Sequence, residues 1–370
     1  MNDSMEGTKP GGWSRADWIL NSLLLCIPAA MLLFFLTTYH VLIFTCACIA
    51  IIPLANLMGK ATEEIAHRLG SGLGGFMNAT FGNAAELIIG LIALKEGNIV
   101  IVKASITGSI IGNILFVLGL SVLIGGIRNG RQTFNLTAAS ASSSTLLLSV
   151  CALAIPALFH LFIPTERLEP IELHLSVTIS IILLLLYGCS LLFSLKTHSH
   201  LYRGKAEHPA KTSWTLRRAV WVLVGSTVFV GAMAEILVHS LDETVSTIGF
   251  TETFVGVIII AIIGNAAEHS TAVLMAWKDQ MNLSLTIAME SSKQIALFVA
   301  PVLVLFGLIL GTGTSTHRMN LDFNPLEVVA VTFSVLMVSS ICHDGESHWL
   351  EGALLLGVYA ILAAGFFFIP

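Results

Sequence analysis

Two identical five-residue segments each place a glutamate inside a long apolar stretch. Residues 82–86 and 264–268 both have the sequence Gly-Asn-Ala-Ala-Glu. Each glutamate lies about fifteen residues into its stretch, so a helix that crosses a bilayer would hold it near the midplane. An ionised carboxylate at that depth costs several kcal/mol unless a cavity, a partner or a cation compensates it. These glutamates therefore favour the binding of a cation or of protons.

The neighbouring residues extend this set of oxygen atoms. Asn83 and Asn265 each precede their glutamate by three positions and share its helix face. The glycines allow the helices to loosen, which frees backbone carbonyl oxygens. Two carboxylates, amides and hydroxyls suit Ca²⁺, which takes six to eight oxygen ligands, whereas Mg²⁺ demands stricter geometry. Soft metals would require thiolate or imidazole ligands, and only His269, next to Glu268, offers one here.

The same carboxylates cannot hold a dication and protons at once. This mutual exclusion is the physical basis of antiport, so the sequence predicts an antiporter rather than a structural pair of glutamates. The helices that follow the two motifs add polar side chains, although small hydroxyl residues also serve as packing contacts in membranes. The residues predicted from these helices are Ser109, Asn113, Ser291 and Gln294.

The elements that must position these residues are membrane-spanning helices. The mean hydropathy is +0.86, 55% of the residues are apolar and only 11% are charged, far from the composition of soluble domains. A bilayer core needs about 20 apolar residues per helix. The predicted spans are residues 18–37, 40–59, 72–94, 99–124, 136–163, 171–195, 214–240, 252–276, 282–310, 325–342 and 349–369.

Basic residues predict the orientation, because cytoplasmic loops hold an excess of Lys and Arg. With a cytoplasmic N-terminus, three basic residues face outward (Lys95, Arg167 and Arg318) and thirteen face inward. The inward set is Lys9, Arg15, Lys60, Arg68, Arg128, Arg131, Lys196, Arg203, Lys205, Lys211, Arg217, Arg218 and Lys278. The sequence therefore predicts a cytoplasmic N-terminus and an external C-terminus.

An internal repeat relates the two halves of the chain. At the offset that superposes the two motifs, Ser109 aligns with Ser291 and residues 115–117 align with 297–299 without a gap. A weaker similarity pairs residues 55–64 with 234–243, with an acidic pair ending a span in each case. Such self-similarity indicates a repeated architecture.

Equivalent points of the repeat are five spans apart. Because five is odd, the halves are inverted in the membrane and the two motifs face each other, as in many secondary transporters. The predicted fold is an all-α polytopic membrane protein with about 11 helices, of which the first lies outside two inverted five-helix repeats. The predicted divisions are residues 1–39 for the N-terminal segment and first helix, 40–195 for one repeat, 196–213 for a cytoplasmic basic connector and 214–370 for the other repeat.

Other polar residues have two interpretations each. Glu235 inside the seventh span could relay cations or protons, or cap a helix contact. Glu290 and Lys293 lie one helical turn apart and could neutralise each other. The histidines of residues 196–213 and the stretch 343–348 have metal-capable side chains, but a flexible connector and a turn account for them more simply.

These motifs resemble those of the cation/proton exchanger family of the calcium/cation antiporter superfamily, from about residue 15 to the C-terminus. The resemblance rests on residues 82–88, 108–115, 264–269 and 294–301. It implies proton-driven calcium transport in which Glu86 and Glu268 bind Ca²⁺ or H⁺. Its implied assisting residues are Asn83, Asn265, Ser109, Ser291 and Gln294. His269 and residues 294–296 look like the proton-coupled branch. This chain departs from the family pattern at Glu290, which replaces a small residue, commonly Gly, and at Lys293, which replaces an apolar residue.

Two alternatives remain beside calcium/proton exchange: sodium/calcium exchange and antiport of another divalent cation such as Mn²⁺. A passive channel is disfavoured, because it would use oxygen rings in a symmetric oligomer, whereas the symmetry here is internal and inverted. An intramembrane metalloenzyme is disfavoured, since no HExxH motif lies at membrane depth. We expect no enzymatic activity and no cofactor besides the transported ions. The expected partners are these ions and the lipid bilayer, with no nucleic acid and with homo-oligomerisation left open. The expected location is the cell membrane of a prokaryote, or a vacuolar or other acidic-organelle membrane of a eukaryote.

Overall fold

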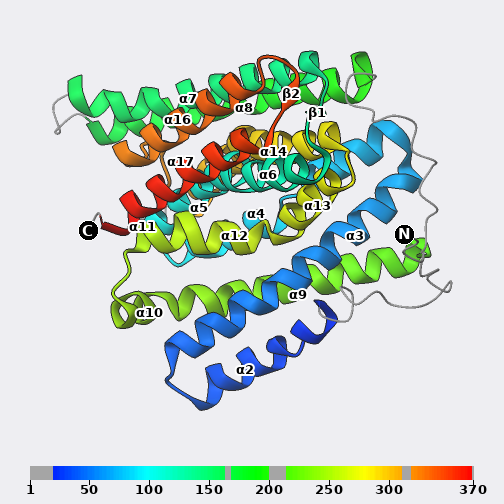
Figure 1. Ribbon diagram of the computed structural model, residues 1–370. Coiled ribbons are helices and arrows are strands. Elements are labelled where there is room, and N and C mark those ends of the chain that lie inside the picture. The colour runs from blue at the N-terminus through cyan, green and yellow to red at the C-terminus, as the bar shows by residue number, and fades with distance from the viewer. Residues whose placement is uncertain (1–19, 163–167, 200–213, 311–317, 369–370) are drawn as a thin grey trace.

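The computed structural model describes residues 20–162, 168–199, 214–310 and 318–368. Helices dominate both halves of the chain, as predicted (Figure 1). The described residues include four π-helical segments, of which η1 and η3 lie in the first half. The helices of that half are α2 (Cys26–Leu36), α3 (His40–Phe81), α4 (Ala84–Lys95), α5 (Ile99–Ile111), η1 (Gly112–Val117), α6 (Leu118–Asn129), α7 (Leu136–Phe162), α8 (Leu168–Leu192) and η3 (Phe193–Thr197).

The second half repeats this order with more interruptions. Its helices are α9 (Leu216–His239), α10 (Leu241–Ile248), α11 (Glu252–Phe254), η5 (Val255–Ile260), α12 (Ala261–Gly264), α13 (Ala266–Trp277), α14 (Met281–Gln294), η6 (Ile295–Val299), α15 (Ala300–Leu310), α16 (Pro325–Ile341) and α17 (Trp349–Phe368). Two short strands, β1 (Gln132–Thr133) and β2 (Glu346–Ser347), pair antiparallel and tie a loop of one half to a loop of the other.

Seven helices among the described residues are long and apolar enough to cross a membrane, and an eighth is obtained if α10 and α11–α12 form one span bent by 111°. Two shorter apolar helices, residues 20–36 and Pro325–Ile341, lie where further spans were predicted. The chain is therefore a multi-pass membrane protein. The number of eleven spans stays a prediction.

The contacts between helices follow the inverted repeat. Several pairs of helices that are in contact have counterparts that are in contact too. Helix α4 contacts α9, and their counterparts α13 and α3 are also in contact. In the same way, the contact of α5 with α16 corresponds to that of α14 with α7, and the contact of α6 with α17 corresponds to that of α15 with α8. The π-helical segments η1 and η6 also occupy equivalent positions after α5 and α14. Segments far apart in sequence thus pack as two interlocked halves.

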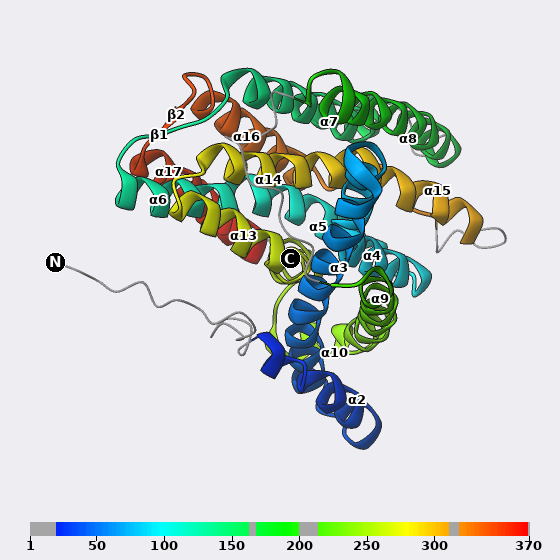
Figure 2. The same ribbon diagram turned by 90° about the vertical axis from the view of Figure 1, so that its right-hand side faces the viewer.

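Two views show where the central helices lie. In Figures 1 and 2, α7, α8 and α16 lie on one side and α2, α9 and α10 on the opposite side. Helices α4, α5, α6, α13 and α14 lie between these two groups, and α3 crosses steeply past them in Figure 2. The central helices carry the repeated motifs, so the motifs are enclosed by the rest of the fold.

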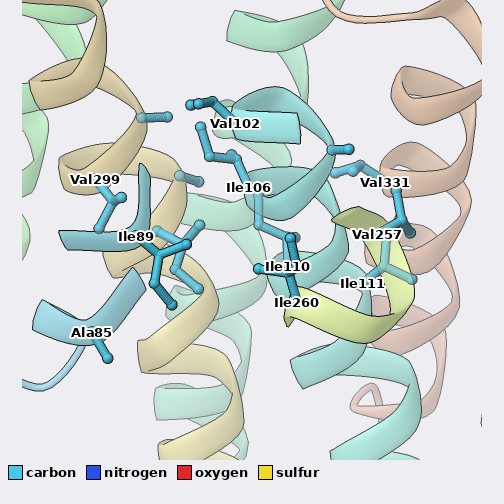
Figure 3. Packing of buried hydrophobic residues seen from close by; sticks show 14 of the residues in the cluster. Ala85, Ile89, Val102, Ile106, Ile110, Ile111, Val257, Ile260, Val299 and Val331 are labelled. Carbon is cyan, nitrogen blue, oxygen red and sulfur yellow. The ribbon is translucent and has the colours of Figure 1, made fainter. Parts of the chain in front are cut away.

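Small residues allow α5 and η5 to approach closely. A Cβ atom on Gly108 would lie 2.2 Å from the carbonyl oxygen of Val257, and one on Gly256 would lie 2.5 Å from the Cβ of Ala104. Figure 3 shows Ile110 of α5 beside Ile260 of η5 in the surrounding apolar packing. Small residues at helix contacts are the usual means of close packing in membranes, where lipid is as apolar as the core. Here they join the two halves beside the motifs.

Helix α3, assigned from His40 to Phe81, bends back on itself next to the predicted boundary at residues 60–71. A Cβ atom on Gly74 would lie 2.1 Å from the carbonyl oxygen of Ala66, whereas residues eight apart in a straight helix are about 12 Å apart along the axis. The apolar span in the first part of α3 ends at Leu69, shortly after Glu63 and Glu64. The counterpart in the second half also breaks, because α9 ends at His239 and Asp242 and Glu243 lie in the first turn of α10. Long helices tolerate acidic residues when their side chains reach water, and Glu63 is exposed.

Candidate functional site

Both repeated motifs interrupt a helix. Helix α3 ends at Phe81 and α4 begins at Ala84, while α12 ends at Gly264 and α13 begins at Ala266. Asn83, at φ −101° and ψ 30°, and Asn265, at φ −95° and ψ 6°, leave the helical conformation at the same motif position. Both helices are thus interrupted within the motif, but at the asparagines: Gly82 keeps helical dihedral angles and Gly264 is still part of α12.

The breaks place each glutamate at the start of a new helix. Glu86 is the third residue of α4, and Glu268 is the third residue of α13. The N–H groups of a first turn lack helical partners and carry the positive end of the helix dipole, which stabilises negative charge. Broken helices whose N-termini meet at the repeat interface are typical of transporter binding sites.

Each glutamate packs against the glycine of the opposite motif. A Cβ atom on Gly264 would lie 3.2 Å from Glu86 Oε1 and 3.4 Å from its Cγ. A Cβ atom on Gly82 would lie 3.6 Å from Glu268 Oε1 and 3.5 Å from Gln294 Oε1. The two contacts are related by the repeat, so the motifs that are 182 positions apart in sequence meet at one place.

One hydrogen bond crosses between the halves at this place: Asn83 Nδ2 donates to Gln294 Oε1 over 2.5 Å. Within the second half, the hydroxyl of Ser291 donates to Glu268 Oε2. The structure therefore brings Asn83, directly before α4, together with the predicted side chains of α13 and α14.

A second chain of hydrogen bonds starts at Asn265. Its Nδ2 donates to the Ser109 hydroxyl over 3.0 Å and to the carbonyl oxygen of Ala261 over 2.9 Å. Its Oδ1 lies 3.5 Å from Asn113 Nδ2, and Asn113 Oδ1 lies 3.1 Å from His269 Nε2. All four of the side chains Asn265, Ser109, Asn113 and His269 are buried. Asn113 thus lies between His269 and the motif asparagine.

Among the buried oxygens that have no hydrogen-bond partner within the described part of the chain, two belong to the motifs: Asn83 Oδ1 and Glu86 Oε2. A buried polar oxygen without a partner is costly, so native structures nearly always satisfy it. Both atoms belong to the first motif, and both can bind a cation directly. The donor set consists of oxygen atoms only, which fits a hard cation such as Ca²⁺ and does not favour a soft one.

The predicted neutralisation of Glu290 by Lys293 is present. Lys293 Nζ lies 2.5 Å from Glu290 Oε1, and the lysine side chain is only 4% exposed. Ser142 of α7 also donates to Glu290 Oε1, over 3.2 Å. Glu290 directly precedes Ser291 and Lys293 directly follows Ser292 on α14, the helix whose Ser291 contacts Glu268.

Glu235 and the histidine-rich stretches lie apart from this group. Glu235 is exposed and reaches Lys95 at 4.0 Å. In the stretch 343–348, Asp344 Oδ1 accepts the backbone N–H of Glu346 and Glu351 Oε2 accepts that of His348, which are turn and helix-start contacts. No group of three His, Cys, Asp or Glu side chains in the described ranges is arranged to hold a metal. Of the connector, residues 200–213 lie outside the described residues.

A third cluster was not predicted. Lys103 Nζ donates to Asn320 Oδ1 over 2.5 Å and to the Asp322 carbonyl oxygen, while Thr107 donates to Glu327 Oε1 over 3.0 Å. Glu327 Oε2 accepts the backbone N–H of Asn324 over 3.0 Å as part of a capping box. These contacts tie α5 to α16. The only signal in the sequence is the presence of Lys103 inside an apolar span, because its partners come from a distant segment.

Together, the fold and the site define a class of protein. Inverted repeats, paired broken helices and carboxylates at their junction are the architecture of a secondary transporter for a cation. A family model described as sodium/calcium exchanger protein matches residues 39–196 and 218–368. The chain belongs to this family.

Individual relatives cover nearly the whole chain. A protein of Aphanothece halophytica named Ca(2+)/H(+) antiporter is 46% identical and covers 95% of this chain and 97% of its own length. The Ca(2+)/H(+) antiporter ChaA of Bacillus subtilis is 43% identical over 88% of this chain and 92% of its own. The crystal structure of the Ca2+/H+ antiporter protein YfkE superposes with a TM-score of 0.81 and 39% identity, over 96% of this chain and all of that one.

Proposed function

We propose that this protein is a secondary active antiporter that exchanges Ca²⁺ for H⁺ by alternating access. The observation that carries the proposal is the reciprocal placement of Glu86 and Glu268, each against the glycine of the opposite broken helix. The names of relatives at 43% and 46% identity support the same pair of ions. The reaction involves no covalent chemistry, so the residues act as ligands and not as an enzyme's catalysts.

The proposed cation ligands are the two glutamates and the amides and hydroxyls around them. Glu86 and Glu268 supply the charge. Asn83 and Glu86 each offer a buried oxygen without a partner in the described residues. Gln294 and Ser291 hold Asn83 and Glu268 in place through hydrogen bonds, and Ser109 does the same for Asn265.

Protons and Ca²⁺ compete for the same two carboxylates. In an apolar surrounding, two ionised carboxylates near each other are costly, and either a dication or protons remove that cost. The state with neither ligand is therefore disfavoured, which discourages the transporter from reorienting empty. Binding of one ion on one side and its replacement by the other couples the two fluxes.

The proposed orientation places the N-terminus in the cytoplasm and the C-terminus outside. It rests on the excess of Lys and Arg in alternate loops. We further propose that residues 40–195 and 214–370 form the two repeats. The equivalent helix contacts in the two halves support this division. The membrane is the cell membrane in a prokaryote, or a vacuolar or other acidic-organelle membrane in a eukaryote.

Reconstitution into liposomes tests the exchange. Purified protein is placed in vesicles with an imposed pH gradient, and Ca²⁺ movement is followed with and without Na⁺. We expect Ca²⁺ accumulation that needs the pH gradient and no Na⁺, and that collapses when a protonophore removes the gradient. Accumulation only with a Na⁺ gradient would show a sodium/calcium exchanger, and Mn²⁺ movement without Ca²⁺ movement would show a different substrate.

The glutamate variants test the site in the same vesicles. Glu86→Gln and Glu268→Gln keep the side-chain size and remove the charge, so each is expected to lower Ca²⁺ accumulation by at least about a hundred-fold, equivalent to several kcal/mol of lost ion binding. Glu252→Gln is the matched control, because Glu252 is exposed at the start of α11. Normal transport by both site variants would show that the cation binds elsewhere.

A further inference from the structure

An apolar groove lies beside the site, on the outer wall of the central helices. It has a volume of about 740 Å³ and runs between α6 and η1 on one side and α12 and α13 on the other. Its lining includes Leu120 and Ile124 from α6, and Val273, Leu274 and Trp277 from α13. These side chains are apolar almost throughout, so the groove is unsuited to hold a file of water or ions.

The length of the groove matches one leaflet of a bilayer. Helix α13 has 12 residues, and a rise of 1.5 Å per residue makes it about 18 Å long. The hydrocarbon core of a bilayer is about 30 Å thick, so one leaflet contributes about 15 Å. The end at Ala266 lies beside the broken motif, and the end at Trp277 lies next to a polar loop. The groove therefore extends from the site to one membrane surface.

The surface end of the groove carries a basic and an aromatic side chain. The Arg128 guanidinium lies 4.1 Å from the centre of the Trp277 ring. Arg128 is exposed, and no carboxylate in the described ranges forms an ion pair with it. Lys278, directly after Trp277, is exposed too. Tryptophan and basic residues at one level are typical of the membrane interface, where phosphate groups of lipids lie.

We propose that this groove binds one acyl chain of an anionic phospholipid, with the phosphate at Arg128 and Lys278. The apolar walls take the chain, and the basic end selects the headgroup. A lipid fits better than water, because the walls offer few polar groups. It also fits better than a second copy of the protein as the sole occupant, because a protein surface of apolar side chains would leave the charge of Arg128 without compensation.

The inner end of the groove connects the lipid to the cation site. His269 and Phe116 line the groove there, with their ring centres 6.3 Å apart. His269 Nε2 lies 3.1 Å from Asn113 Oδ1, and Asn113 contacts Asn265 of the second motif. A chain packed on the His269 ring holds the imidazole against Asn113. Lipid occupancy therefore supports the geometry of the motif without touching the ion.

Fluorescence quenching tests the lipid site without measuring transport. The chain has six tryptophans, and replacing the other five by Phe leaves Trp277 as the only emitter. A second protein adds Arg128→Gln and Lys278→Gln to this background, so that the same emitter loses both basic residues, which are exposed. Both are reconstituted in phosphatidylcholine with increasing fractions of phosphatidylglycerol that carries bromine on its acyl chains. Bromine quenches tryptophan on contact.

We expect half-maximal quenching of Trp277 at a fraction of brominated phosphatidylglycerol about thirty-fold lower with the two basic residues than without them, since each basic residue near an anionic headgroup contributes about 1 kcal/mol. Brominated phosphatidylcholine should quench Trp277 in both proteins to the same extent. Equal curves for the two proteins in brominated phosphatidylglycerol would overturn the proposal. Protection of Trp277 from all brominated lipids, together with cross-linking of Trp277→Cys protomers, would show a second copy in the groove instead.

A bulky residue in the groove tests the link to the site. Val273→Phe fills the groove without adding an emitter, and Val224→Phe places the same residue on an exposed face of α9, where Val224 is 49% exposed. We expect Val273→Phe to abolish the anionic-lipid preference of Trp277 and to slow exchange severalfold, whereas Val224→Phe changes neither. Loss of the preference with unchanged exchange would keep the lipid site but refute its coupling to the motif. An unaltered preference in Val273→Phe would refute the site itself.

Discussion

The Glu86 side chain lies against the backbone of Gly264, a residue of the other half of the chain. A Cβ atom at Gly264 would come within 3.2 Å of Glu86 Oε1 and 3.4 Å of Cγ. The motif glycine therefore leaves room for the glutamate of the opposite motif, and the same relation holds between Glu268 and Gly82. The two motifs are parts of one site because each supplies the space that the other fills.

Gly264→Ala is expected to weaken Ca²⁺ transport. The added methyl group would push the Glu86 carboxylate by a few tenths of an ångström, and overpacking of this kind costs about 1–3 kcal/mol. The Ca²⁺ concentration for half-maximal transport should therefore rise by roughly ten-fold to a hundred-fold. The measurement is the initial rate of pH-driven Ca²⁺ uptake over a range of Ca²⁺ concentrations.

Gly231→Ala is the control for this prediction. Gly231 is also helical, in α9, and a Cβ there would meet nothing within 4 Å. Alanine favours helix over glycine, so this variant should be as stable as the parent or more so. Equal transport constants for Gly264→Ala and Gly231→Ala would show that the glycine contact has no influence on the cation.

The sequence predicts this site better than it predicts the helices around it. A buried carboxylate is conspicuous in an apolar stretch, and exact repetition links two such stretches, so Glu86 and Glu268 can be paired without coordinates. The contact between Asn83 and Gln294 follows less directly, since a shared helix face leaves many partners open. The glutamate–glycine contacts cannot be derived at all, because spacing does not fix how closely two helices approach.

The position of the bend in α3 can be predicted from the sequence, whereas its tightness cannot. The predicted boundary at residues 60–71 runs into Gly70, Gly72, Gly74 and Gly75, and glycine disfavours a helix more than any residue except proline. The equivalent stretch of the second half ends at Gly249, whose φ of +76° is a left-handed conformation that favours glycine. The close approach of Gly74 to Ala66 depends on the path of the backbone, which residue types alone do not fix.

Apparent Ca²⁺ affinity is expected to fall as the pH falls. Ligand carboxylates must be deprotonated to bind a metal, so protons and Ca²⁺ compete by mass action. At pH values low enough for both carboxylates to be protonated in the absence of Ca²⁺, the apparent Ca²⁺ affinity should fall with each pH unit. The fall should be about ten-fold per unit if Ca²⁺ displaces one proton and about a hundred-fold if it displaces two. Equilibrium binding of radioactive Ca²⁺ to the purified protein at several pH values measures the slope.

The variant Glu268→Gln separates these cases. With one carboxylate left, any remaining Ca²⁺ binding should show a slope of at most about one. A slope that does not change in Glu268→Gln would place the competing proton on another group. Glu252→Gln, on the exposed start of α11, should keep the slope and the affinity of the parent.

The amide of Asn265 is expected to be needed as a donor and not only as an oxygen ligand. Its Nδ2 donates to Ser109 and to the Ala261 carbonyl, which holds the start of α13 against α5. Asn265→Asp keeps the shape but replaces this donor with a second oxygen. Leaving buried acceptors without a donor costs about 1–3 kcal/mol each, so transport should fall by roughly ten-fold or more. Uptake assays measure the loss.

Ser109→Ala provides the comparison for Asn265. It removes only one of the two acceptors, and the amide keeps its bond to Ala261. The expected loss is smaller than in Asn265→Asp, by about the value of one hydrogen bond. A larger loss in Ser109→Ala than in Asn265→Asp would mean that the serine hydroxyl itself binds the ion, and that its bond to Asn265 is secondary.

The ion pair of Glu290 and Lys293 is expected to stabilise the protein only as a pair. Lys293 is buried, and its Nζ lies 2.5 Å from Glu290 Oε1. Lys293→Met would leave the Glu290 carboxylate without this partner, and breaking one side of a buried pair costs about 3–5 kcal/mol. The melting temperature in detergent should fall by roughly 6 °C or more. The double variant Glu290→Gln/Lys293→Met removes both charges at similar size, so it should regain most of the loss. A double variant as unstable as Lys293→Met would show that the lysine stabilises the protein through packing and not through its charge.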